Sequence, residues 1–158
     1  MQDEEASGRG EPTAATAAAE QPSLMTTLRR FESAHGRGAV EQMRACFHDE
    51  AVIESVASDT RPLGPDETVK ALAAALRDGV YRIYGWQYEE LAPEVVLSTT
   101  RARHRTSDRA IRDETVYRLI SGRDGLMWRV RIFRSRNAAL EHLERHGPGL
   151  GLDAITRQ

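Results

Sequence analysis

The hydrophobic period of the chain changes from helical to two-residue near Val80, and this change constrains the fold more than any other feature. Before Val80, apolar residues recur at every third or fourth position. After it, four long segments alternate side chains and end at short turns. Helices followed by hairpin-connected strands are typical of an α+β fold with one curved antiparallel sheet. The sequence therefore predicts this fold class.

The expected elements follow from this period and from capping and turn residues. Ser23 can cap the first helix, and glycines 36 and 38 end it. Helices are expected over residues 24–36, 40–47, 65–78 and 136–146, and strands over 51–55, 81–91, 94–105, 110–120 and 126–133. We therefore expect a single domain over residues 23–146. The acidic, Ala-rich segment 1–22 is expected to be disordered, and 147–158 to be a flexible tail.

Composition narrows the class of protein. The net charge of −2 argues against a general nucleic-acid binder. The chain shows no signal peptide and no apolar run of about 20 residues, so no membrane association is expected. Its one cysteine, Cys46, allows no intrachain disulfide and is compatible with a cytoplasmic location.

Alternation divides the expected sheet into two faces. One face carries arginines 101, 103, 105, 112, 118, 129 and 131. The other mixes apolar with small polar residues: Val96, Ser98, Thr100, Ala102, His104, Asp113, Thr115, Tyr117, Leu119, Trp128, Val130, Ile132 and Arg134. Charged residues are rarely buried without partners, so we expect the helices to cover the mixed face. Its hydroxyl groups are too polar for a plain core, and this predicts a ligand cavity.

The arginine face is expected to meet solvent or a second subunit. No aromatic ladder stands among its arginines, which argues against single-stranded nucleic acid as a partner. Apolar residues share this expected face, namely Val95, Leu97, Val116, Met127 and Phe133. Their combined surface predicts a homodimer through the outer side of the sheet.

Three stretches resemble the nuclear-transport-factor-2-like (NTF2-like) superfamily, which includes SnoaL-like cyclases, ketosteroid isomerases and limonene-epoxide hydrolases. They are GAVEQMRACFHDEAVIES, LGPDETVKAL and DGLMWRVRIFRSRNAAL. The resemblance covers Leu24 to His146. It implies a cone-shaped roll in which three N-terminal helices pack on a curved antiparallel sheet, with a short C-terminal helix. It does not specify the reaction, because this scaffold hosts several chemistries.

The resemblance also locates the positions where relatives carry catalytic groups. Phe31 stands at the tyrosine position of ketosteroid isomerases, Ser55 at the position of the base, and Thr115 at the second acid. Ile132 stands where cyclases carry an acid. None of these residues supplies the proton chemistry of those enzymes, so their mechanisms are not expected here.

Two hypotheses remain open. In the first, the protein is an enzyme for a small hydrophobic substrate (an isomerase, cyclase, dehydratase or hydrolase) with His104, Asp113 and Tyr117 as catalytic residues, because His104 and Asp113 are expected on one face. In the second, it binds an apolar or polycyclic molecule without turnover. The expected ligand-binding residues are Phe31, Ser55, Trp86, Ser98, Thr100, Thr115, Trp128 and Ile132. No cofactor and no metal are expected, since Leu143 interrupts the zinc-protease pattern around His142 and His146.

Overall fold

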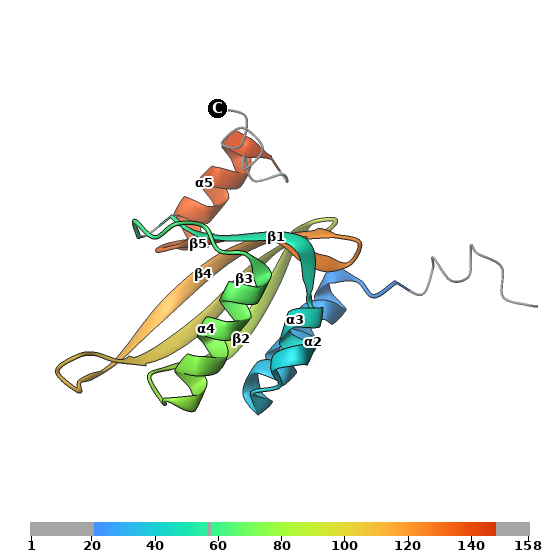
Figure 1. Ribbon diagram of the computed structural model, residues 1–158. Helices are drawn as coiled ribbons and strands as arrows, with labels where there is room; N and C mark the ends of the chain where they lie inside the picture. The colour runs from blue at the N-terminus through green and yellow to red at the C-terminus, as the bar shows by residue number, and fades with distance from the viewer. Residues whose placement is uncertain (1–20, 57, 148–158) are drawn as a thin grey trace, which may run out of the picture.

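The computed structural model describes residues 21–56 and 58–147 (Figure 1). The helices are α2 (Leu24–Arg37), α3 (Val40–Ala45), α4 (Pro65–Arg77) and α5 (Arg136–His146), and the strands are β1 (Phe47–Ser55), β2 (Tyr81–Ala92), β3 (Val95–Arg105), β4 (Ile111–Arg123) and β5 (Leu126–Phe133). The expected tails, 1–22 and 147–158, lie almost wholly outside the described residues. Within the described part of the chain, none of the helices combines the length and the apolar character needed to cross a bilayer.

The strands form one sheet in the order β1-β5-β4-β3-β2. Strands β2 to β5 pair with their neighbours in antiparallel fashion, as the hairpin turns predict. The expected antiparallel sheet is therefore confirmed for the four long strands, and β1 joins it by pairing with β5 in parallel, so the complete sheet is mixed. β1 also begins at Phe47, earlier than predicted, because Phe47 pairs with Met127 of β5 ahead of an irregularity that separates it from Val52.

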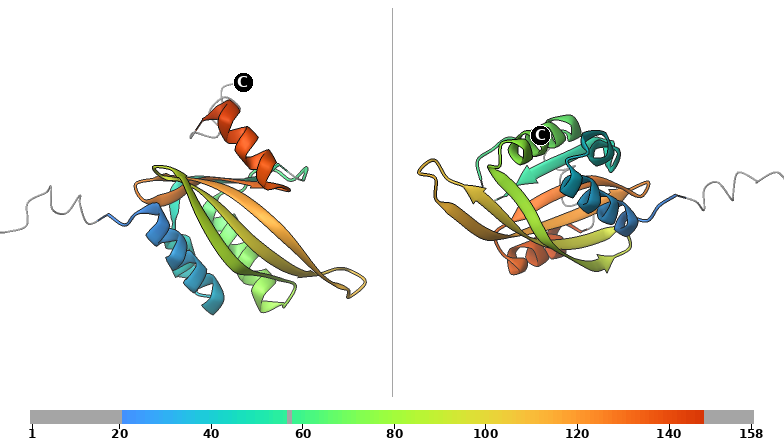
Figure 2. Two further views of the ribbon diagram at one scale, coloured as in Figure 1. Left: turned by 180° about the vertical axis from the view of Figure 1, so that it is seen from behind. Right: turned by 90° about the horizontal axis from the view of Figure 1, so that it is seen from below.

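Helices cover both faces of this sheet. Figure 1 shows α2, α3 and α4 on one side and α5 on the other, and both views in Figure 2 agree. The sheet is open, since β1 and β2 form its two edges and do not pair with each other. We call the side under α2 to α4 the inner face and the side under α5 the outer face.

Local sequence signals account for the helix boundaries. The Ser23 side chain accepts a hydrogen bond from the Thr26 N–H at 3.2 Å, which caps the start of α2. Gly38 ends α2 with a φ of 64°, a left-handed conformation that glycine adopts without steric cost. Pro65 occupies the first turn of α4, where no backbone N–H is needed.

Two apolar clusters hold the layers together. The inner cluster joins the helices to the sheet, with Phe31, Met43 and Val69 packed against Val96 and Ile120. The outer cluster lies under α5 and consists of Val95, Leu97, Leu119, Phe133 and Ala139. Each member is at most 4% exposed, so α5 covers this apolar patch within one chain.

Candidate functional site

The register of the β3–β4 hairpin decides which side chains face the helices. Ser98 lies opposite Arg118, and Val96 lies opposite Ile120. Opposite residues point to the same side, so the even-numbered residues of both strands share the inner face. The expected alternation is correct for β3 and wrong for β4. Arg118, expected on the outer face, therefore lies on the inner one.

A bulge in β2 brings aromatic side chains to the same face. The pairing of β2 with β3 shifts between Tyr84 and Gln87, and Gly85 there has a φ of 63°. A bulge inserts one extra residue and reverses the alternation beyond it. As a result, Tyr81 and Ile83 before the bulge and Trp86 and Tyr88 after it all face the helices.

These side chains surround a cavity of about 140 Å³ between the inner face and helices α2 and α4. Most of its wall is apolar, and the described lining residues include no carboxylate. The lining comprises Leu28, Phe31, Phe47, Ile53, Thr68, Leu72, Tyr81, Ile83, Trp86, Tyr88, Ser98, Arg118, Ile120, Met127, Val130 and Ile132. We refer to this space as the cavity.

Arg118 is the charged member of the lining. Its Nη1 donates to Thr100 Oγ1 at 2.6 Å, and its Nη2 lies 3.5 Å from the Tyr81 hydroxyl. Both partners are neutral, and no ion pair joins Arg118 to a carboxylate in residues 21–56 or 58–147. Burial lowers the pKa of the guanidinium by desolvation. Arginine nevertheless remains charged at neutral pH, so the cavity contains a cation.

Ser98 and Tyr88 are further polar members of the lining, beside Tyr81 and Thr68. The Ser98 side chain is 1% exposed, and its Oγ has no hydrogen-bond partner among the described residues. The Tyr88 hydroxyl, by contrast, donates to Glu32 Oε2 at 2.9 Å. Burial, followed by this hydrogen bond, raises the pKa of Tyr88. Tyr88 is therefore engaged with α2, while Ser98 is free to meet a ligand.

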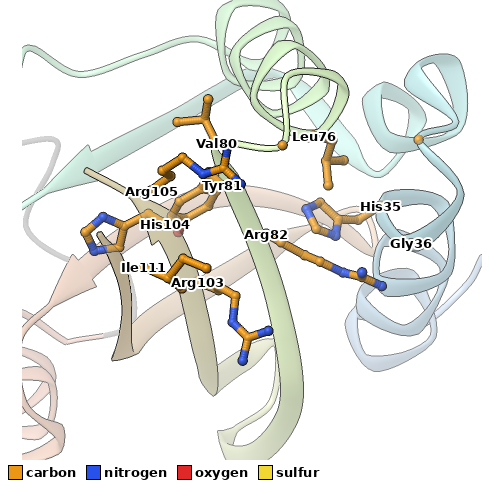
Figure 3. A pocket seen from close by; sticks show the side chains of 12 residues that line it. His35, Gly36, Leu76, Val80, Tyr81, Arg82, Arg103, His104, Arg105 and Ile111 are labelled. Carbon is orange, nitrogen blue, oxygen red and sulfur yellow. The ribbon is translucent and has the colours of Figure 1, made fainter. Parts of the chain in front are cut away.

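A groove of about 470 Å³ adjoins the cavity at Tyr81 (Figure 3). Its described lining contains basic side chains and no acidic ones: His35, Arg82, Arg103, His104 and Arg105 stand beside Gly36, Gly38, Leu76, Gly79, Val80, Tyr81 and Ile111. Figure 3 shows Arg82 extending from its strand toward α2, below His35. We call this the basic groove.

Four of the predicted ligand-binding residues line the cavity: Phe31, Trp86, Ser98 and Ile132. Thr100 is fully buried behind them and accepts the hydrogen bond from Arg118. Ser55 lines a neighbouring groove that shares Tyr81, Arg118 and Ile132 with the cavity.

The remaining predicted ligand residues lie elsewhere. Thr115 pairs with Arg101 on the outer face and is exposed, because the β4 register is the reverse of the expected one. Trp128 sits in a bulge of β5, where its ring lies 4.9 Å from the Arg123 guanidinium and 4.0 Å from that of Arg129. Neither residue lines the cavity, although Thr115 lines the groove beside Ser55.

The three predicted catalytic residues do not come together in one site. His104 lies opposite Arg112 and Asp113 lies opposite Arg103, so the two residues point to opposite sides of the sheet. The expectation that His104 and Asp113 share one face is therefore wrong. Asp113 instead accepts hydrogen bonds from Tyr84 at 3.0 Å and from Arg103 Nε at 3.1 Å. The Arg103 hydrogen bond, and next the one from Tyr84, lower the pKa of Asp113.

Tyr117, the third predicted catalytic residue, also lies on the outer face. It packs against the outer cluster under α5, away from the cavity. His104 alone faces inward, at the basic groove, where its Nε2 is 3.9 Å from Glu114 Oε1.

Sequence reasoning missed Arg118, Tyr81 and Tyr88 as cavity residues. For Arg118 a signal existed, because Val116 and Ile120 flank it at two-residue spacing and are apolar enough for a buried face. Tyr117 and Leu119, which alternate with these residues, form an equally strong apolar pattern. This pattern led to the wrong assignment of the inner face of β4.

Comparison with known proteins identifies the fold. No protein-family model matches the sequence, and no curated protein matches it. Among solved structures, an NTF2-like protein from Burkholderia xenovorans LB400 superposes with a TM-score of 0.58 at 14% identity, covering 75% of this chain and 93% of that one. The protein has the NTF2-like fold.

Enzymes also occur among the NTF2-like neighbours. A Mycobacterium tuberculosis LEH-like epoxide hydrolase aligns with a TM-score of 0.55 at 15% identity, over 84% of this chain and 96% of that one. The epoxide hydrolase/cyclase-like enzyme SalBIII, described in pyran ring formation in salinomycin, aligns with a TM-score of 0.55 at 15% identity, over 72% and 92% of the two chains. At such identities the likeness establishes the architecture and leaves the chemistry to the residues of this chain.

Proposed function

We propose that this NTF2-like protein binds a small, mainly apolar molecule in the cavity. The observation that carries the proposal is the lining, in which an apolar wall surrounds a few buried polar groups. That combination is typical of ligand sites, where apolar contacts provide affinity and a few polar groups fix orientation.

The volume of the cavity limits the size of the ligand. An engineered protein cavity of about 150 Å³ binds benzene. A cavity of about 140 Å³ therefore suits one ring or a short branched chain. A polycyclic molecule would have to extend into the basic groove or into the groove beside Ser55.

We favour binding over catalysis because of the residues at the cavity. The described lining supplies no carboxylate that could act as a base, and His104 lies at the basic groove. One structural neighbour is named as an LEH-like epoxide hydrolase, but this cavity presents an arginine, a serine, a threonine and two tyrosines.

A cavity-filling substitution tests the proposal. Binding of benzamide, cyclohexanol and benzyl alcohol is measured by calorimetry and by the shift in unfolding temperature. We expect saturable binding of at least one of these probes, and Ile132→Phe should weaken it about tenfold or more because the larger ring occupies the cavity.

Val40→Phe is the matched control, since Val40 is 45% exposed on α3 and does not line the cavity. It should leave the affinity unchanged. Absence of saturable binding for every probe, or equal binding by wild type and Ile132→Phe, would contradict the proposal.

A further inference from the structure

Two arginines of the sheet, Arg131 and Arg118, differ in the groups that surround their guanidinium groups. Arg131, on the outer face, is 6% exposed, and its Nη2 lies 3.0 Å from Glu54 Oε2, although the two groups are not aligned for a hydrogen bond. Arg118, on the inner face, donates its hydrogen bonds to the hydroxyl groups of Thr100 and Tyr81, and Glu114 acts on it only through space. Arg131 thus has a carboxylate in direct contact, whereas Arg118 is half-buried and has no carboxylate in direct contact among the described residues.

A half-buried cation without a carboxylate in direct contact is costly. Removing an ion from water costs several kcal/mol even after the protein relaxes, and neutral hydroxyl groups recover only part of this. Desolvation accordingly lowers the pKa of the Arg118 side chain. An anion placed beside the guanidinium would recover the missing electrostatic energy, and the guanidinium geometry suits a carboxylate, which it can bind through two parallel hydrogen bonds.

The surroundings of Arg118 leave space for such a group. Arg118 lines both the cavity and the adjoining groove near Ser55, so it is accessible from open space. Ser98 lies directly opposite Arg118 in the β3–β4 register, and its buried Oγ has no partner among the described residues. A bound carboxylate would accept from both groups.

Charge outside the cavity favours the same class of ligand. The basic groove, which meets the cavity at Tyr81, presents Arg82 and Arg105 without an acidic lining residue among those described, whereas the groove near Ser55 also includes Glu114. Figure 3 shows Arg105 beside Tyr81 and Arg82 extending toward α2. A cleft lined by one sign of charge raises the local concentration of ions of the opposite sign.

We propose that the cavity selects organic monocarboxylates, with the carboxylate held by Arg118 and Ser98 and a one-ring or short aliphatic body against the apolar wall. This proposal rests on the proposed function and adds to it the chemical class of the ligand. Arg118 then determines specificity, because a neutral molecule of the same shape leaves the guanidinium uncompensated.

Matched pairs of probes test the proposal: benzoate against benzamide, and cyclohexanecarboxylate against cyclohexanecarboxamide, by calorimetry near pH 7.5. The members of a pair have nearly the same shape and differ in charge. We expect at least one acid to bind about tenfold or more tightly than its amide. Sodium chloride and inorganic phosphate are titrated as well, to separate organic acids from simple anions.

Variants test whether Arg118 causes the preference for acids over amides. Arg118→Met should reduce the acid-to-amide ratio to near one while amide binding persists, and Arg118→Lys should retain part of the ratio. Arg112→Met, an exposed arginine of the same strand and face, should leave the ratio unchanged. Should Arg118→Met fail to fold, the wild-type ratio together with Arg118→Lys still decides the question.

The outcomes distinguish the two proposals. Equal binding of acids and amides overturns the carboxylate proposal and leaves the proposed function intact. Binding of chloride or phosphate as tight as that of benzoate also overturns it, as does an unchanged ratio in Arg118→Met. Failure of both acids and amides to bind overturns both proposals.

Discussion

His35 is a titratable side chain buried where it cannot easily carry a charge. It is 2% exposed, its ring lies 6.3 Å from Phe31 and 5.8 Å from Trp86, and its Nε2 has no hydrogen-bond partner among the described residues. Burial lowers its pKa, and the positive charges of Arg118 and Arg82 lower it further. The folded protein therefore favours the neutral imidazole.

Stability should consequently depend on pH through His35. Its pKa is below 6.5 in the folded state and near 6.5 when unfolded, so the unfolded chain binds more protons between these two values. The free energy of unfolding should thus fall as the pH drops below about 6.5. Urea denaturation at about pH 7.5 and pH 5.5 measures this change.

A variant separates His35 from the other titrating groups. His35→Phe fills a similar space without a titratable group, and it should reduce the loss of stability between the two pH values. An identical pH dependence in wild type and His35→Phe would show that His35 does not contribute.

At the scale of elements, the sequence predicted most boundaries correctly because their signals are local. Ser23 accepts its hydrogen bond three residues along the chain, and Gly38 needs only its own positive φ to end α2. Signals of this kind lie within one turn of chain, so a single sequence contains them.

Pairing between distant strands was not predictable in the same way. The parallel partnership of β1 with β5 joins Ile53 to Val130, far apart in the sequence. The face of β4 depends on the length of the turn between Arg105 and Ile111, and a change of one residue there would exchange its faces. The sequence therefore identified Ser98 of β3 as a cavity residue but did not identify Arg118 of β4.

The β4–β5 turn is tied to the start of α2 by a close backbone contact. Gly125 has a φ of 73°, and a Cβ atom added there would lie 2.0 Å from the Pro22 carbonyl oxygen. The Thr27 hydroxyl also donates to the Gly125 carbonyl oxygen. A side chain at position 125 would thus force the turn away from the helix.

Gly125→Ala should lower the free energy of unfolding by about 2 kcal/mol or more, from the left-handed conformation together with the clash. Gly38→Ala is the matched control, since Gly38 has a φ of 64° but no atom within 4 Å of an added Cβ. It should cost only about 1–2 kcal/mol, from conformation alone. Equal losses in urea denaturation would mean that the contact with Pro22 does not constrain the turn.

At the scale of the whole molecule, α5 covers part of the apolar surface from which the homodimer was predicted. That expectation rested on apolar residues of the outer face. Val95, Leu97 and Phe133 are covered by α5, whereas Val116 and Met127 are on the inner side. A homodimer stays a prediction, and light scattering of the full chain measures it.

Loosening α5 should expose the outer cluster and promote association. Ala139 is fully buried between α5 and the sheet, so Ala139→Glu would place a charge among Val95, Leu97 and Leu119. We expect a loss of about 2–4 kcal/mol in the free energy of unfolding and larger species in light scattering at rising concentration. Asn137→Glu adds the same charge at an exposed site of the same helix and should do neither. If both variants match the wild type in stability and size, α5 does not protect the outer cluster from solvent.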